Sequence, residues 1–200
     1  MEVKLVTTTP EIVISDCAKV CYATTTEKDL TQSLVHSHKH LAVLRFAFAV
    51  VSVKGISIAC QNQLVRSKHL DFLVESKRYV DATKGEFEFI MPDVDGVSRE
   101  KMEFFWIDVT RLYQELLDSG LKKEDARAIL PLNTSTKVNI AGNLQSWMDA
   151  IRLRVSNKAQ REIRLMFIEI WKQLAEAYPN VFIASMEING KTLDEWITNG

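Results

Sequence analysis

The segment QLVRSKHLDFLVESKRY, residues 63–79, concentrates the polar chemistry of this chain. Its cationic side chains are Arg66, Lys68, Lys77 and Arg78, and Gln63, Ser67 and Ser76 lie among them. A guanidinium presents planar paired donors that match phosphate and carboxylate oxygens. The segment therefore indicates one of two things. It is either a loop that grips an anionic ligand from both ends, or a solvated helix end followed by a charged turn.

The composition bounds the kind of protein. Two hundred residues with 46% hydrophobic content predict one globular domain, residues 1–200. A net charge of −1 argues against a general nucleic-acid or membrane-surface binder. The longest apolar run, residues 46–53, is too short to span a bilayer. The N-terminus lacks a signal-peptide pattern, so we expect a cytoplasmic protein without nucleic-acid or membrane partners.

The cysteines and histidines do not point to a metal site. Cys17, Cys21 and Cys60 have no metal-binding spacing and lie on apolar segments, which predicts buried free thiols in a reducing compartment. His36, His38 and His40 alternate, so they indicate either a metal site on a strand face or a solvated turn. Because no carboxylate or cysteine stands beside them to complete a ligand shell, we predict no metal.

Hydrophobic periodicity and capping residues predict an α+β fold, with a mixed or antiparallel sheet packed against helices. The expected strands are residues 3–8, 41–53, 86–91 and 137–141, and residues 68–76 are expected to form a loop. The expected helices are residues 11–23, 29–35, 56–65, 98–120, 123–129, 143–154 and 158–178.

Two of these helices have a predicted buried face. In residues 158–178 a strong apolar stripe is formed by Ile163, Phe167, Ile170, Trp171 and Leu174. In residues 11–23 the apolar face is expected to hold Ile12, Cys17, Val20 and Cys21.

Three blocks of the sequence resemble the flavin-dependent thymidylate synthase (ThyX) family. Arg66-Ser-Lys68, seven residues, then Ser76-Lys-Arg78-Tyr79 is similar to the family signature Arg-His-Arg, seven residues, Ser, one residue, Arg-Tyr. Residues 124–132, with Ala126-Arg127 and Leu130-Pro131, resemble the Ala-Arg-x-x-Leu-Pro segment. Leu153-Arg154 followed by Ala159-Gln160-Arg-Glu162-Ile163 resembles a third block. The blocks occur in family order, and the likeness covers most of the chain.

The resemblance implies a uridine monophosphate site whose residues are Gln63, Arg66, Ser76, Lys77, Arg78, Arg127 and Arg154. Arg154 and Ser76 are the expected catalytic residues. An arginine near the uracil carbonyls stabilises the enolate formed when C5 acts as a nucleophile. Ser76 lacks an adjacent base, so we assign it to binding and orientation. Two points remain open: Arg154 could instead pair with Glu162, and Val74 stands where the family has a carboxylate or amide.

The flavin side departs further from the family. The residues implied in FAD binding are Arg66, Ser67, Lys68, Asn143, Asp149 and Lys158. Among these, Ser67 replaces the signature histidine and Lys68 the second arginine. Upstream, Arg45-Phe46 stands where the family has a Glu-His pair, and Gln145 replaces an arginine.

The activity implied by the resemblance is a one-carbon transfer to C5 of dUMP. Methylenetetrahydrofolate is the expected donor, reduced FAD the hydride source, and a homotetramer the expected assembly. If the flavin site is lost, water would capture the exocyclic methylene and the product would be a hydroxymethyl nucleotide. A third alternative is a nucleotide-binding homologue without catalysis.

Overall fold

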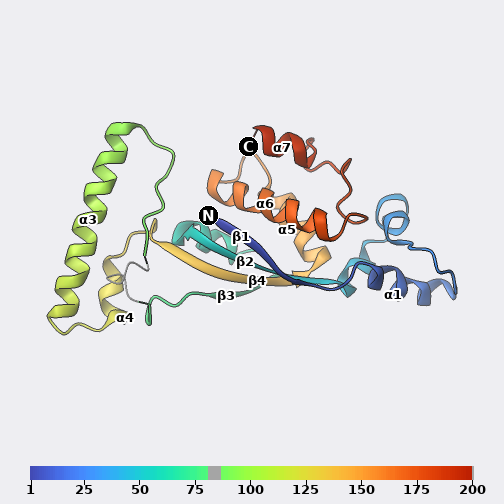
Figure 1. Ribbon diagram of the computed structural model, residues 1–200, viewed down its shortest axis with the longest axis horizontal. Helices are drawn as coiled ribbons and strands as arrows, with labels where there is room; N and C mark the ends of the chain where they lie inside the picture. Colours follow the sequence, from blue (N-terminus) through green and yellow to red (C-terminus); the bar gives the residue numbers. More distant parts are fainter. Residues whose placement is uncertain (81–86, 200) are drawn as a thin grey trace.

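A four-stranded antiparallel sheet forms the centre of the computed structural model, which describes residues 1–80 and 87–199 (Figure 1). Its strands follow the order β1 (Glu2–Thr8), β2 (Phe48–Ser57), β4 (Ser135–Asn143) and β3 (Asp71–Val74). Each neighbouring pair is antiparallel. The predicted α+β class is confirmed, and the sheet is antiparallel rather than mixed.

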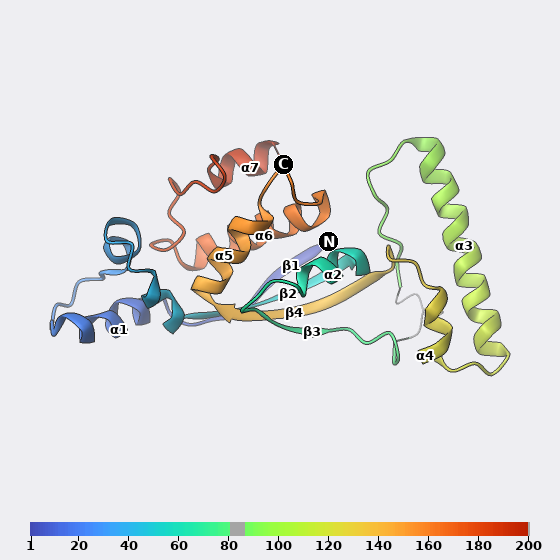
Figure 2. The same cartoon turned by 180° about the vertical axis from the view of Figure 1, so that it is seen from behind.

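The helices divide between one face of the sheet and its two ends. Helices α5 (Leu144–Arg154), α6 (Arg161–Ala177) and α7 (Leu193–Asn199) lie over one face (Figures 1 and 2). The long helix α3 (Gly96–Asp118) and the short α4 (Lys123–Ala126) lie at one end, and α1 (Ile12–Tyr22) lies at the other. Within the described ranges, no helix is both long and apolar enough to cross a membrane.

The remaining helical segments are short. Helix α2 (Ile58–Leu64) follows directly after β2. A π-helical turn, η1 (Ser33–Ser37), and a 3-10 helix, η2 (Leu41–Phe46), connect α1 to β2. A second 3-10 helix, η4 (Arg127–Ile129), extends α4.

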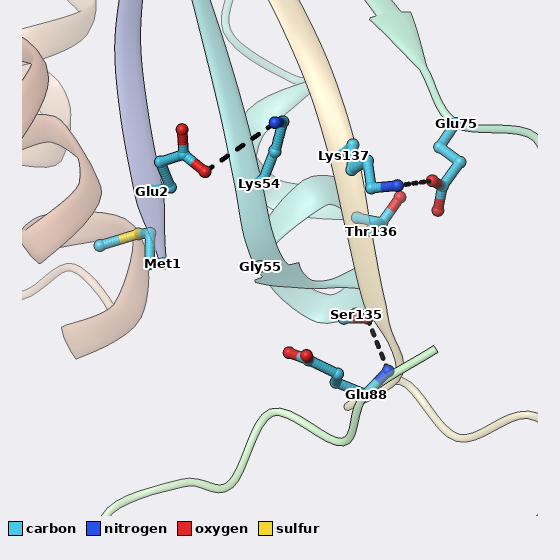
Figure 3. A pocket seen from close by; sticks show the side chains of 9 residues that line it. All are labelled: Met1, Glu2, Lys54, Gly55, Glu75, Glu88, Ser135, Thr136 and Lys137. Atoms are coloured by element: carbon cyan, nitrogen blue, oxygen red, sulfur yellow. Dashed lines mark hydrogen bonds and ion pairs between the residues drawn. The ribbon is translucent and has the colours of Figure 1, made fainter. Parts of the chain in front are cut away.

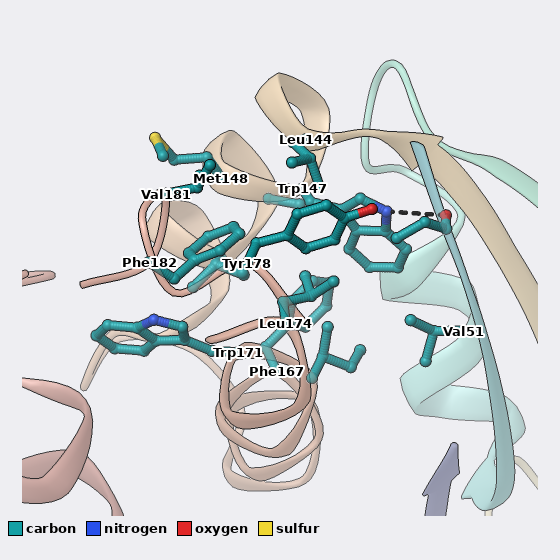
Figure 4. Packing of buried hydrophobic residues seen from close by; sticks show 14 of the residues in the cluster. Val51, Leu144, Trp147, Met148, Phe167, Trp171, Leu174, Tyr178, Val181 and Phe182 are labelled. Carbon is teal, nitrogen blue, oxygen red and sulfur yellow. Dashed lines mark hydrogen bonds between the residues drawn. The ribbon is translucent and has the colours of Figure 1, made fainter. Parts of the chain in front are cut away.

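The main core lies between the sheet and α6. Alternating residues of β2 and β4 point into it, because side chains on a strand have a period of two. The five residues predicted to form the apolar face of α6 are all buried, which confirms that face. Figure 4 shows Trp147 of α5 in the same core, where its indole Nε1 donates to the Ala49 carbonyl over 3.1 Å.

The predicted strand 41–53 is wrong in its first half. Residues Leu41–Phe46 form the 3-10 helix η2, and the strand begins only at Phe48. The short run of Val, Leu and Phe suits either a strand or a buried helical turn. Here η2 buries Val43 and Leu44 against α1 and α5, so tertiary contacts select the turn.

Two other sheet predictions differ from the structure. Residues 68–76 were expected to be a loop, but they contain the edge strand β3, which pairs with β4. Residues 86–91 were expected to form a strand. Residue 86 lies outside the described residues, and the rest of this segment makes a single bridge between Phe89 and Thr134. The C-terminal helix α7 was not predicted.

The predicted face of α1 is also wrong. Its buried residues are Ile14, Ser15 and Ala18, whereas Val20 is 82% exposed. Ser15 tolerates burial because its hydroxyl accepts a hydrogen bond from the Leu30 amide over 2.9 Å. Of the three cysteines that were expected to be buried, only Cys60 is buried, while Cys17 is partly exposed and Cys21 is exposed.

A junction at Ser57 joins three elements. The Ser57 hydroxyl caps α2 by accepting from the Cys60 amide over 2.9 Å. Its own amide and hydroxyl donate to the carboxylate of Glu162 in the first turn of α6, over 2.7 and 2.6 Å. Glu162 therefore fixes the start of α2 relative to both β2 and α6.

We expect Glu162→Ala to lower the free energy of unfolding by about 1–3 kcal/mol, because it leaves the buried Ser57 amide without an acceptor. Urea denaturation measures the change. The matched control is Glu176→Ala, an exposed residue of the same helix, which should stay within about 0.5 kcal/mol of the unmodified protein. Equal destabilisation by the two substitutions would contradict this role of Glu162.

Candidate functional site

Arg154, at the C-terminal end of α5, is held against the C-terminal end of α2. Its Nη2 donates to the Gln63 carbonyl over 2.6 Å and contacts the Ser67 hydroxyl at 3.4 Å. The Gln63 side chain in turn donates to Gln160, just before α6. We call these four residues, Gln63, Ser67, Arg154 and Gln160, the Arg154 cluster.

The Arg154 guanidinium is only partly satisfied. Its Nε is buried and has no hydrogen-bond partner among the described residues. Burial lowers the pKa of the Arg154 guanidinium, although an arginine remains protonated at neutral pH. The alternative of an Arg154–Glu162 ion pair is not realised in the described part of the chain, since Glu162 binds Ser57. Arg154 thus retains an unused donor.

A second set of basic residues surrounds the end of β3. Arg78 donates from Nε and Nη2 to one carboxylate oxygen of Glu124, over 3.2 and 2.9 Å. Arg127 Nε donates to the Glu124 main-chain carbonyl over 3.0 Å. Ser76 is exposed, and its hydroxyl accepts from the Arg78 amide at 3.4 Å. We call Ser76, Arg78, Glu124 and Arg127 the Arg78 cluster.

The two clusters lie on opposite sides of α2. Successive residues of an α-helix are about 100° apart, so Gln61 and Gln63 point in nearly opposite directions. Gln63 belongs to the Arg154 cluster, whereas Gln61 lines a cavity of about 510 Å³ together with Glu124 and Arg127. Five of the seven predicted nucleotide residues are therefore divided between these two clusters, which we call half-sites, whereas the exposed Arg66 and the buried Lys77 belong to neither.

Lys77 differs from its neighbours in the signature segment. Its side chain is buried, forms an ion pair with Glu75, and places Nζ 4.0 Å from the centre of the Phe87 ring. Glu75 also pairs with Lys137 over 3.2 Å. The predicted nucleotide contact of Lys77 would require this ion pair to break, so we assign Lys77 to holding the loop in shape.

A cavity of about 420 Å³ lies at the C-terminal end of β2 and the N-terminal end of β4, and Glu75 also lines it (Figure 3). Lys54 pairs with Glu2 at 3.9 Å and Lys137 pairs with Glu75, and the Glu88 carboxylate also lines the cavity. The Ser135 hydroxyl accepts from the Glu88 amide over 2.9 Å. The lining side chains therefore carry three carboxylates and two ammonium groups, which is a poor match for an anionic phosphate.

The residues predicted on the flavin side differ in how available they are. Ser67 is 5% exposed and faces Arg154. Asn143 caps α5 by accepting from the Ser146 amide over 2.9 Å. By contrast, Arg66, Lys68, Asp149 and Lys158 are exposed, with Asp149 3.8 Å from Arg152. Four of the six predicted flavin residues can thus reach a ligand.

The histidines lie in turns rather than on a strand. His36 Nε2 lies 3.0 Å from the Val181 carbonyl, and His40 Nδ1 lies 3.3 Å from the Tyr22 hydroxyl. No three metal-ligating side chains converge anywhere in residues 1–80 and 87–199.

Sequence reasoning missed the acidic partners of the site. Glu75 and Glu124 hold Lys77 and Arg78, and both carboxylates are distant in sequence from at least one cation that they bind. Glu124 stands inside the block that ends at Pro131, and Glu162 stands inside the block that begins at Leu153. The position of Glu124 and Glu162 within motif blocks indicated that they could belong to the site. It did not show which residues they contact.

A comparison with known proteins gives a family match that contains all three sequence blocks. The family model for thymidylate synthase complementing proteins matches residues 4–180. A flavin-dependent thymidylate synthase of Geobacter sulfurreducens is 27% identical over 187 residues, which cover 86% of this chain and 81% of that protein. One from Pyrococcus furiosus is 33% identical over 155 residues, 75% of this chain and 62% of that protein.

A solved structure shares the fold. The crystal structure of ThyX from Helicobacter pylori with FAD and dUMP matches with a TM-score of 0.75 and 21% identity. The match covers 92% of this chain and 97% of that one. The chain spans less than two thirds of some relatives, including 64% of a Corynebacterium glutamicum flavin-dependent thymidylate synthase.

We expect Cys60 to resist alkylation in the folded protein. Burial, reinforced by the nearby Glu162 carboxylate, raises the pKa of the Cys60 thiol to about 12, and only a thiolate reacts. At pH 8, iodoacetamide should therefore label the exposed Cys21 first and Cys60 only after unfolding. Peptide mass spectrometry reads the sites, and labelling of native Cys60 as fast as Cys21 would contradict this assignment.

Proposed function

The chain belongs to the thymidylate synthase complementing protein family, and from this premise we propose that it is a flavin-dependent thymidylate synthase. The proposed reaction transfers a one-carbon unit from methylenetetrahydrofolate to C5 of dUMP. The observation that carries the proposal is the survival of the basic residues of both half-sites within the three family blocks. The sequence resemblance to this family is confirmed by the family match.

The two half-sites suit a nucleotide monophosphate. A phosphate carries nearly two negative charges and three acceptor oxygens, so several arginines and a hydroxyl can share it. Ser76, Arg78 and Arg127 supply such donors in the Arg78 cluster. In the Arg154 cluster, the side chain of Arg154 is partly exposed, so its guanidinium is a donor that a uracil oxygen can satisfy.

Arg154 is the proposed catalytic group because its positive charge is fixed in place. Its contacts with the Gln63 carbonyl and Ser67 orient the guanidinium before any ligand arrives. A preorganised cation stabilises the negative charge that develops on the uracil oxygen as C5 attacks. Ser76 binds and orients the nucleotide, since within the described residues its hydroxyl contacts only the Arg78 amide and has no adjacent base.

The exposed residues of the flavin side fit FAD by their chemistry. Lys68 and Lys158 are exposed cations that would hold the cofactor's diphosphate, and Phe46 is an exposed ring suited to stacking. When bound, reduced FAD supplies the hydride that completes the methyl group. Lys68 acts as a point charge where a guanidinium would bridge two oxygens, so we propose weaker FAD binding than with the full family signature.

We propose that each complete site joins half-sites from different subunits of a homotetramer. One ligand cannot contact opposite sides of α2 at once, so a second copy must supply the other half. Exposed apolar side chains are available for assembly on α3, where Phe104, Phe105 and Ile107 are 49–61% exposed. At the other end of the molecule, Phe46 and Phe48 are 59% and 53% exposed.

The activity is tested by incubating the protein with dUMP, methylenetetrahydrofolate and chemically reduced FAD, followed by mass spectrometry of the nucleotide. We expect thymidylate. A hydroxymethyl product, or unchanged dUMP from protein that binds the nucleotide, would overturn the proposed reaction.

Mixing two inactive variants tests the shared site. Arg78→Ala and Arg154→Ala should each weaken dUMP binding by about 2 kcal/mol, or roughly thirtyfold. Joint refolding places the intact half-sites of the two variants together in about a quarter of the sites if subunits pair at random. Calorimetry should then show that fraction binding at the original affinity. No recovery in properly assembled mixtures would contradict a site shared between subunits.

Restoring the family's histidine and second arginine in the signature segment should strengthen FAD binding. We expect Ser67→His with Lys68→Arg to raise the affinity about tenfold, equivalent to about 1.4 kcal/mol. Quenching of flavin fluorescence measures the affinity, and dUMP titration checks that Arg154 remains in place. If the unmodified protein purifies with full FAD occupancy, the proposed weakening is wrong.

A further inference from the structure

The ion pair between Arg78 and Glu124 links the signature segment to the start of α4. Both Nε and Nη2 of the guanidinium donate to the same oxygen, Glu124 Oε2, over 3.2 and 2.9 Å. These two nitrogens form the side-on edge of the guanidinium, which is the edge that binds carboxylate and phosphate oxygens. The carboxylate thus takes up the donors that a phosphate needs.

We propose that Glu124 is an internal competitor for the nucleotide phosphate, which must displace the carboxylate from Arg78 in order to bind. The proposal rests on the proposed nucleotide site. It adds a residue that lowers the affinity of that site for ligands that carry a phosphate.

The side chain of Glu124 can move away from its partner more easily than the side chain of Glu75, the other carboxylate of this region. The Glu75 side chain is 11% exposed and is held by Lys77 and Lys137. The Glu124 side chain is 39% exposed, and its partner Arg78 is 52% exposed. An exposed ion pair contributes little free energy, so a ligand phosphate can break the Arg78–Glu124 contact at small cost.

The main-chain carbonyl of Glu124 continues to hold Arg127 after the carboxylate moves away from Arg78. Arg127 Nε donates to the main-chain carbonyl of Glu124, and that contact does not depend on the carboxylate. The cavity of about 510 Å³ beside Glu124 gives the incoming group room next to Arg127. Displacement of the side chain would therefore leave both arginines facing the phosphate.

This competition acts only on ligands whose charged group needs Arg78. A phosphate dianion binds a guanidinium more strongly than a carboxylate of single charge, whereas an uncharged nucleoside offers nothing to replace Glu124. The pair therefore lowers the affinity for nucleoside monophosphates and leaves the affinity for uncharged nucleosides unchanged.

The test compares Glu124→Gln with Asp125→Asn, an exposed neighbour whose substitution makes the same change of net charge. Calorimetric titrations use dUMP, deoxyuridine and inorganic phosphate. Because the exposed pair is weak, we expect Glu124→Gln to tighten dUMP and phosphate binding about two- to fivefold. Deoxyuridine binding should not change, and Asp125→Asn should behave as the unmodified protein.

The outcomes separate this inference from the proposed function. Unchanged or weaker dUMP binding by folded Glu124→Gln, or the same gain in Asp125→Asn, overturns the competitor role. If Glu124→Gln tightens phosphate binding but dUMP binds no better than phosphate to any of the proteins, the competitor role stands and the nucleotide site fails. Thermal unfolding of each variant confirms that it is folded before titration.

Discussion

The hydrogen bonds between Ser57 and Glu162 are the constraint on which the site depends. They place the start of α2 against the first turn of α6. Because Ser57 is buried, water cannot replace the Glu162 carboxylate as the acceptor for its amide. From that fixed start, α2 presents Gln63 to Gln160 and to Arg154. A shift of this junction would move the Arg154 cluster as a unit.

A consequence of that placement is that the chain carries two half-sites rather than one site. Helix α2 stands between the Arg154 cluster and the Arg78 cluster, and we propose that a second subunit completes each site. The same chain exposes large apolar side chains on α3 and around Phe46. In the shared-site proposal, the contact between subunits would both cover this apolar surface and complete the site.

Ser67 explains how the signature segment can change without losing its shape. The residue is buried and contacts Arg154, so at this position the chain supports the nucleotide side of the site. The adjacent Lys68 remains exposed. The pair Glu75–Lys77 stabilises the other end of the segment from within the protein. Exposed flavin-side residues such as Lys68 can therefore vary while the buried Ser67 keeps its contact with Arg154.

Periodicity and motif spacing were enough to predict the α+β class, the buried face of α6 and the family, because both are local properties of the chain. It did not determine the 3-10 helix η2 or the edge strand β3, since short apolar runs take the conformation that their neighbours select. The candidate arginines were found from their spacing. The tertiary structure was needed to identify their acidic partners, Glu75 and Glu124. It was also needed to show that the arginines are divided between two clusters on opposite sides of α2. Ion pairs form between residues far apart in sequence, and no local pattern records which side of a helix each will face.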